Sequence, residues 1–210
     1  MRIVLIPIIL ILLWVLSHNI KKSKSTFKES VSSYLAHEDE ANSTRKKDIS
    51  NLPYIEVPVQ SFPFDITLND AKKQLQIAEY KKEILSLAEK RLLNLIGISN
   101  TDLKKAYGPA NLELLSIYDQ NYSRYIRTLH LLAECIYEEY PDKAVAVLEY
   151  CVSLGTDISG TYYLLGQYYL NHNDAEHFTA LYDKIPDKNS ISGKVILNKL
   201  SNLQNPDSVL

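Results

Sequence analysis

The sequence predicts an all-α protein in which an N-terminal transmembrane helix precedes a domain of α-helical hairpins. Three observations support this fold class. Six glycines and eight prolines among 210 residues are too few for a turn-rich β protein, whereas Leu, Ile, Lys, Glu and Tyr are abundant. One long apolar run lies near the N-terminus, and the second half of the chain repeats apolar residues at helical spacing. These features divide the chain into a membrane segment (residues 1–20), a stalk with a proline-containing linker (21–66) and a helical domain (67–210).

The balance of charge argues against one class of function. The chain has 23 basic and 25 acidic residues, so it lacks the basic excess that drives binding to nucleic acid. We therefore expect no nucleic-acid partner.

The two cysteines, Cys135 and Cys151, fall on consecutive predicted helices at unequal distances from the turn between them. The resulting axial offset of about 10 Å exceeds the reach of a disulfide bond. We expect two buried free thiols.

Residues 3–20, IVLIPIILILLWVLSHNI, form the predicted membrane segment. They carry no formal charge, and as a helix they would extend about 27 Å, close to the hydrocarbon thickness of a bilayer. Pro7 stands near the start, where a membrane helix tolerates it, and Trp14 stands near the far end, where interfacial aromatics occur. The alternative is a signal peptide cleaved before His18, with Val15 and Ser17 as its small-residue pattern, but only one basic side chain precedes the run. We expect a retained anchor.

Four lysines predict the orientation of this anchor. Lys21, Lys22, Lys24 and Lys28 follow the apolar run, and no acidic residue comes before Glu29. Basic residues beside a membrane helix remain on the cytoplasmic side in most proteins. We expect a single-pass membrane protein whose main domain lies in the cytoplasm.

The stalk and the linker differ in composition. Residues 21–50 are polar and mixed in charge, which predicts a flexible tether with at most transient helix. Pro53, Pro58 and Pro63 exclude a helix from residues 52–65. Because this linker is rich in apolar side chains, we expect it to pack on the helical domain. Recruitment of a proline-binding module is the alternative.

A long helix is predicted from Thr67 to about Gly97. Thr67 and Asp70 would form a capping box at its start. A first apolar stripe follows the spacing of a coiled coil, although Lys82 and Glu89 interrupt it: Leu68, Ala71, Leu75, Ala78, Leu85, Leu92 and Ile96. A second stripe contains Ile84, Leu87, Ala88 and Leu95. Two stripes favour packing against several helices, and a homodimer through residues 67–96 is the alternative.

Glycines, prolines and capping residues predict the helices that follow. Pro109 suits a first helical position, and Gly155 suits a position just past a helix end. Together with the other capping residues, these signals predict six further helices. The first three start near Ala110, at Asn121 or Ser123, and at Pro141. The last three start at Ser159, at Asn173 or Asp174 (ending before Pro186) and at Ser190 (ending near Leu203).

Two stretches of the second half share one pattern at a shift of 33 positions. Four positions of the first correspond to four of the second: Leu129, Leu132, Ala133 and Ile136 to Tyr162, Leu165, Gly166 and Tyr169. This spacing resembles the tetratricopeptide repeat, a helix–turn–helix unit of about 34 residues. The best-matching units span about 126–155 and 159–186. Glycine inside a helix costs about 1 kcal/mol relative to alanine, and the resemblance implies that Ala133 and Gly166 are small because a second helix packs closely there.

The resemblance also implies a concave groove that binds a protein or peptide partner. In this family the first helix of each unit lines the groove, which gives eight candidate residues: Arg127, His130, Glu134, Tyr137, Tyr163, Gln167, Leu170 and Asn171. Such units need neighbours to bury their faces, so we expect residues 85–119 to form a degenerate first unit and residues 190–203 a capping helix. The sequence thus predicts a membrane-anchored scaffold or adaptor.

No motif predicts catalysis, a cofactor or a metal. The chain has no glycine-rich phosphate loop and no H-E-x-x-H sequence. His130 and Glu134 stand one helical turn apart and would supply two metal ligands, but His172 and His177 lack partners for a complete set. We interpret these residues as surface positions and Cys151 as part of the core. An enzyme is not expected, and a self-associating structural membrane protein is the alternative to the scaffold.

Overall fold

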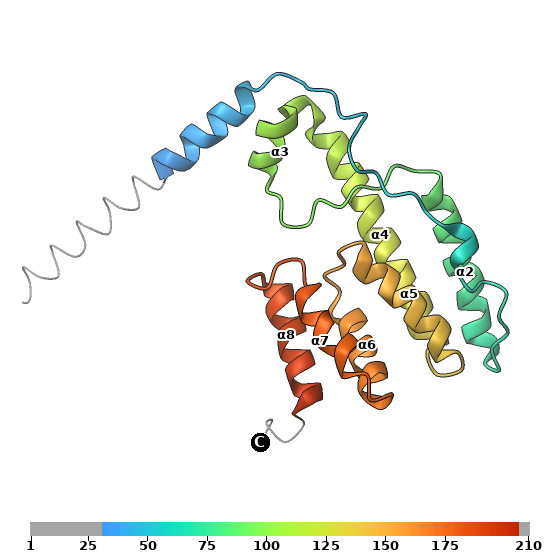
Figure 1. Cartoon of the computed structure of the whole chain (residues 1–210). Helices are drawn as coiled ribbons and strands as arrows, with labels where there is room; N and C mark the ends of the chain where they lie inside the picture. Colours follow the sequence, from blue (N-terminus) through green and yellow to red (C-terminus); the bar gives the residue numbers. More distant parts are fainter. Residues whose placement is uncertain (1–30, 206–210) are drawn as a thin grey trace, which may run out of the picture. The chain divides into compact units, whose positions relative to one another are not determined.

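The computed structural model describes residues 31–205, and the regular elements in that range are all helical (Figure 1). The predicted all-α class is confirmed for this part of the chain. The membrane segment predicted at residues 3–20 lies outside the described residues. Within 31–205, no helix combines the length and the apolar character that crossing a bilayer requires. Contacts divide the described residues into a small unit (31–48 and 99–112) and a large unit (49–98 and 113–205).

The small unit begins with a helix at residues 31–43, where the sequence predicted a flexible stalk. That prediction is wrong for a physical reason. The carboxylates of Glu38 and Glu40 lie 2.8 and 2.7 Å from the ammonium groups of two consecutive lysines on α3 (Asn100–Tyr107). Ala41 is fully buried. The charges that suggested a solvated tether are balanced by side chains more than 60 positions away in the sequence.

Two backbone segments of the small unit, residues 45–47 and 107–108, lie in close contact. The N–H of Lys47 donates to the backbone oxygen of Tyr107 at 3.0 Å. Next to it, Gly108 has φ +85°, and a Cβ at this position would lie 2.6 Å from the backbone oxygen of Arg45. Glycine is therefore required between α3 and the short 3₁₀ helix η2 (Pro109–Asn111).

The large unit is built on one hydrophobic core, to which its helices and its linker contribute. Its elements are η1 (Val59–Ser61), α2 (Ala71–Ala88), all but the first residue of α4 (Leu112–Ile136), α5 (Pro141–Ser153), α6 (Ser159–Asn171), α7 (Ala175–Asp183) and α8 (Ile191–Gln204). Within this unit α6 is central, because it contacts α5, α7 and α8 (Figure 1).

The helix predicted at 67–97 is shorter in the structure. It begins after Asp70, whose side chain accepts hydrogen bonds from two backbone N–H groups of the first turn, so Asp70 is the N-cap and the predicted capping box with Thr67 does not form. It ends at Ala88. Residues 89–98 are irregular because their backbone bonds to two other segments: Ile55 N–H donates to Leu92 O at 3.0 Å, and Leu93 N–H donates to Tyr118 O at 3.2 Å.

Helix α4 is continuous through the positions where a new helix was predicted to start. Asn121 does not cap a helix; its side-chain amide donates instead to the backbone oxygen of Arg91 at 3.1 Å. The expected degenerate hairpin at 85–119 is also wrong. That range holds the end of α2, the irregular segment, α3, η2 and the start of α4.

The later helix boundaries agree with the sequence. Pro141 occupies the first turn of α5, and Gly155 follows that helix with φ +79°. The Asp174 side chain caps α7 by accepting from His177 N–H, and Ser190 caps α8 by accepting from Gly193 N–H. These boundaries were predictable because each depends on a local cap.

The proline-containing linker packs on the helices, as predicted. Phe62 is buried, and its ring meets those of Phe64, Tyr125 and Tyr150 edge-on at centroid distances of 5.7 to 6.4 Å. The linker is thus part of the core of the large unit.

The residues that carry the repeat spacing are all buried: Leu132, Ala133, Ile136, Tyr162, Leu165, Gly166 and Tyr169. A Cβ on Gly166 would lie 3.0 to 3.3 Å from side-chain atoms of Leu203, Leu200 and Phe178. The close neighbours at this glycine are therefore side chains from α8 and α7, not the backbone of another helix.

Both cysteines are free. Cys151 is fully buried, and burial raises the pKa of its thiol to about 12. Cys135 is only half-buried, so the prediction of two buried thiols is confirmed for Cys151 alone.

Candidate partner-binding groove

A groove runs between α2 and α4 in the large unit. It consists of two hollows, of about 470 and 340 Å³, that share Tyr80 of α2 and Leu131 of α4. Other residues that line it are Gln76, Glu79, Arg127, Glu134, Tyr137 and Leu164. We call this feature the α2–α4 groove.

Two ion pairs lie at the ends of the groove. The Lys73 ammonium is 2.5 Å from a carboxylate oxygen of Glu138, and the Arg124 guanidinium is 2.6 Å from a carboxylate oxygen of Glu83. Such partly exposed pairs contribute little to stability, but they join the two walls. Lys73 and Glu83 are ten positions apart on α2, which corresponds to about 15 Å along the helix.

The floor of the groove is apolar and half-buried. Tyr80, Leu131 and Leu164 are each partly exposed in it. The Tyr137 hydroxyl donates to the backbone oxygen of Leu164 at 3.1 Å. Burial raises the pKa of Tyr80 and of Tyr137, so both phenols are neutral near pH 7. The floor therefore offers contact area without charge.

Three charged side chains beside this floor have no partner in an ion pair within residues 31–205. Glu79 stands on the α2 wall, and Glu134 and Arg127 stand on the α4 wall. Arg127 balances the charge of Glu79 in the hollow that both line, so the net charge of −1 in the groove comes from Glu134, in the other hollow. A segment with a basic side chain would be attracted there.

The structure brings together three of the eight predicted binding residues: Arg127, Glu134 and Tyr137 line the groove. His130 does not. Its Nδ1 lies 3.2 Å from Thr161 Oγ1, and its ring fills the space beside Gly160 on α6. Burial lowers the pKa of His130, and this effect is larger than the opposing influence of Glu134. His130 is therefore a packing residue between α4 and α6.

The four candidates on α6 also lie outside the α2–α4 groove. Gln167 donates to the Tyr163 hydroxyl at 3.1 Å, and the ammonium of Lys199 on α8 is 5.8 Å from the centroid of the Tyr163 ring. Leu170 packs against the core, and Asn171 is exposed at the end of the helix. Position 164, next to Tyr163, is the residue of α6 that reaches the groove.

The α2 wall was missed because α2 lies outside the two matching units. One signal was present in the sequence: Tyr80 is a large aromatic residue that belongs to neither apolar stripe of that helix. A bulky side chain off both stripes indicates a second contact surface.

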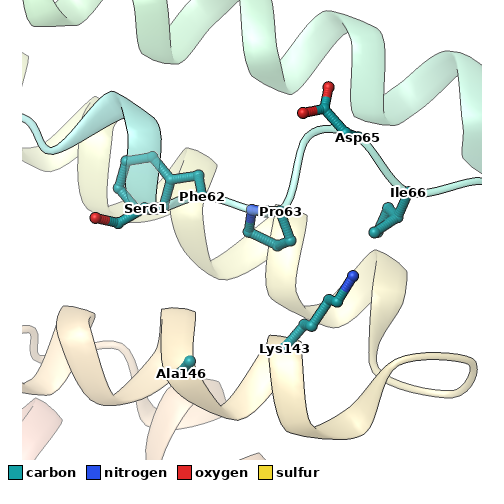
Figure 2. A pocket seen from close by; sticks show the side chains of 7 residues that line it. All are labelled: Ser61, Phe62, Pro63, Asp65, Ile66, Lys143 and Ala146. Atoms are coloured by element: carbon teal, nitrogen blue, oxygen red, sulfur yellow. The ribbon is translucent and has the colours of Figure 1, made fainter.

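A separate hollow of about 350 Å³ lies between the linker and α5 (Figure 2). In Figure 2 the Lys143 side chain extends from α5 toward the linker, while the Asp65 carboxylate points away from Lys143. The Lys143 ammonium also lies 5.2 Å from the centroid of the Tyr140 ring. The two hollows of the α2–α4 groove together have a larger volume and a more apolar lining, so this groove is the better candidate for binding a polypeptide.

No family model, curated protein or solved structure matches this chain. The resemblance to tetratricopeptide repeats thus depends on the residue spacing alone. Among residues 31–205, no three His, Cys, Asp or Glu side chains are placed to hold a metal ion.

Proposed function

We propose that this chain is a membrane-anchored helical scaffold that binds a short segment of a partner protein in the α2–α4 groove. The observation that carries the proposal is the groove itself. Its half-buried apolar floor is bordered by the unpaired charges of Glu79, Glu134 and Arg127. Peptide-binding grooves combine apolar pockets with a few polar groups in this way.

The size and charge of the groove favour a particular kind of segment. A length of about 15 Å accommodates about ten residues of helix or four to five residues of extended chain. The partner segment would place apolar side chains on Tyr80 and Leu131 and a basic side chain near Glu134.

The proposal includes two tetratricopeptide-like hairpins, α4–α5 and α6–α7, with α8 as a capping helix. Its support is the burial of Ala133 and Gly166 at corresponding positions, together with the contacts of α6 with α5, α7 and α8. The hairpins would hold Leu131 and Leu164, which stand 33 positions apart, on the same side of the groove.

In this proposal the anchor is residues 3–20, and the four lysines after it would keep the helical domain on the cytoplasmic side. Anchoring would raise the local concentration of a bound partner at the membrane.

Site-specific photo-crosslinking in intact cells tests the groove. A photoreactive benzoylphenylalanine at Gln76 lies in the groove, whereas the same group at the exposed Ser86 of α2 lies outside it. We expect a crosslinked product from position 76 that is absent from position 86. Leu131→Glu and Tyr137→Ala should abolish the product, and Tyr163→Ala should leave it unchanged. Equal products from 76 and 86, or loss with Tyr163→Ala alone, would contradict the proposal.

A second candidate function, self-association through α2, is favoured by one observation. The first apolar stripe of this helix faces solvent: Leu75 is 70% exposed and Leu85 is 40% exposed, and Ala71 and Ala78 are exposed beside them. A second copy would cover this face in the alternative structural role.

A further inference from the structure

The helix at residues 31–43 has four apolar residues and Glu38 on one side, and only the second half of this side is covered. Val31, Tyr34, Leu35, Glu38 and Ala41 follow the i, i+3, i+4, i+7 spacing that aligns side chains on one side of a helix. Ala41 is fully buried, and Glu38 bonds to α3. Val31, Tyr34 and Leu35, by contrast, are 40, 63 and 54% exposed. The first turns of this helix extend beyond α3 in Figure 1.

The sequence just before this face carries the charge of a membrane-binding segment. Lys21, Lys22, Lys24 and Lys28 precede it, and each lysine near an anionic membrane contributes about 1 kcal/mol of attraction. Three residues of chain span at most about 11 Å, so Val31 cannot lie farther than that from the backbone of Lys28. Lysines bound to lipid headgroups would therefore keep Val31, at the start of the helix, within about 11 Å of a headgroup-bound backbone.

We propose that the face formed by Val31, Tyr34 and Leu35 contacts the headgroup region of an anionic membrane and fixes the small unit against it. The proposal rests on the membrane anchor of the proposed function. Tyrosine suits this position because its ring is apolar and its hydroxyl can reach water or headgroups.

Two of the three acidic residues in the second half of the helix, Glu38 and Glu40, are paired within the small unit. Glu38 and Glu40 would be repelled by anionic lipid if they were free. Each forms an ion pair inside the small unit, Glu38 with Lys104 and Glu40 with Lys105. The charges of Glu38 and Glu40 are thereby balanced within the small unit, which leaves Asp39 as the one acid of residues 31–43 without an ion-pair partner among the described residues.

Tryptophan fluorescence of the full chain in vesicles tests the contact. Trp14→Phe removes the only tryptophan, and Tyr34→Trp then introduces a single probe on the proposed face. Ser33→Trp is the matched control, because Ser33 is exposed on the opposite side of the same turn. The vesicles contain phosphatidylcholine and phosphatidylserine with brominated acyl chains. We expect severalfold stronger quenching and a bluer emission at position 34 than at position 33, and weaker quenching without phosphatidylserine.

The other outcomes overturn the inference in distinguishable ways. Equal quenching at positions 33 and 34 in a chain that floats with the vesicles would leave the anchor intact and remove the contact. Blue emission from position 34 without lipid quenching would show that protein, such as a second copy of this chain, covers the face. A chain that does not float would remove the anchor and the contact together. Failure of the groove crosslinks would contradict the proposed groove but would leave both the anchor and the membrane contact unaffected.

Discussion

Gly166 lies in the middle of α6 with side chains of two other helices around its Cα. Glycine at this helical position costs about 1 kcal/mol relative to alanine. The limited space for a Cβ beside α7 and α8 explains why glycine is found here. A Cβ would approach Leu203, Leu200 and Phe178 to 3.0, 3.1 and 3.3 Å. These contacts involve the ends of side chains, and Leu203 is partly exposed and able to move. Alanine is therefore nearly tolerated, whereas a longer side chain is not.

For the purified full chain in detergent micelles, we expect Gly166→Ala to change the free energy of unfolding by less than about 1 kcal/mol, because the gain in helix propensity offsets the crowding. Gly166→Leu should lower it by about 1–3 kcal/mol through overpacking. Urea titration followed by circular dichroism measures both. Asn171→Leu, at an exposed position of the same helix, is the control. A stable Gly166→Leu variant would contradict the close packing of α6 with α7 and α8.

His130 shows how a residue chosen for binding can instead serve packing. Its burial against Gly160 and Thr161 lowers its pKa, and Lys199 acts in the same direction. The folded protein thus holds this imidazole neutral at a pH where the unfolded chain, with a pKa near 6.5, begins to bind a proton. The unfolded state then binds more protons, so stability rises with pH in this range and falls as the pH drops below about 6.5.

His130 should therefore affect how steeply the free energy of unfolding changes with pH. Between pH 7.5 and 5.5 the parent chain should lose unfolding free energy more steeply than His130→Gln, by up to about 1.4 kcal/mol per pH unit below pH 6.5. Urea titrations at four pH values measure the difference, and the other histidines cancel in the comparison. Identical slopes for parent and variant would mean that His130 titrates equally in both states.

At the scale of elements, local caps determined some boundaries and distant contacts determined others. Asp174 and Ser190 start α7 and α8 through hydrogen bonds within three residues, and the sequence indicated both. The end of α2 at Ala88 depends on Leu92 and Leu93, whose backbone groups bond to Ile55 and Tyr118. No local signal carries such information, because the bonding partners lie about 25 to 37 positions away.

The linker is extended or irregular apart from the single turn η1, and its contribution to stability can be measured. Phe62 is 8% exposed and meets three aromatic rings. We expect Phe62→Ala to lower the free energy of unfolding by about 3–5 kcal/mol, as deletion of a buried aromatic side chain does. Gln60→Ala, at an exposed position of the same linker, should change it by less than about 0.5 kcal/mol. A loss below about 1 kcal/mol for Phe62→Ala would indicate that the linker is not part of the core.

At the scale of the whole molecule, the two candidate functions require different oligomeric states. The scaffold needs only one copy, whereas the structural alternative would bury Leu75 and Leu85 of α2 against a second copy. We expect the full chain in detergent to sediment as a monomer, with no change on Leu75→Glu or Leu85→Glu. Analytical ultracentrifugation with density matching measures this directly. A dimer that both substitutions dissociate would favour the structural role.

The sequence by itself determined the helical class, the later helix boundaries, the packed linker and the buried set around Ala133 and Gly166. These features follow from composition, caps and apolar spacing, which act over a few residues. Only the tertiary structure decided that residues 31–43 are helical, that α4 is unbroken, and that Arg127, Glu134 and Tyr137 share a groove with α2 whereas His130 does not. Those outcomes depend on ion pairs, backbone bonds and cavities formed by residues far apart in the chain, where spacing along the sequence no longer measures distance.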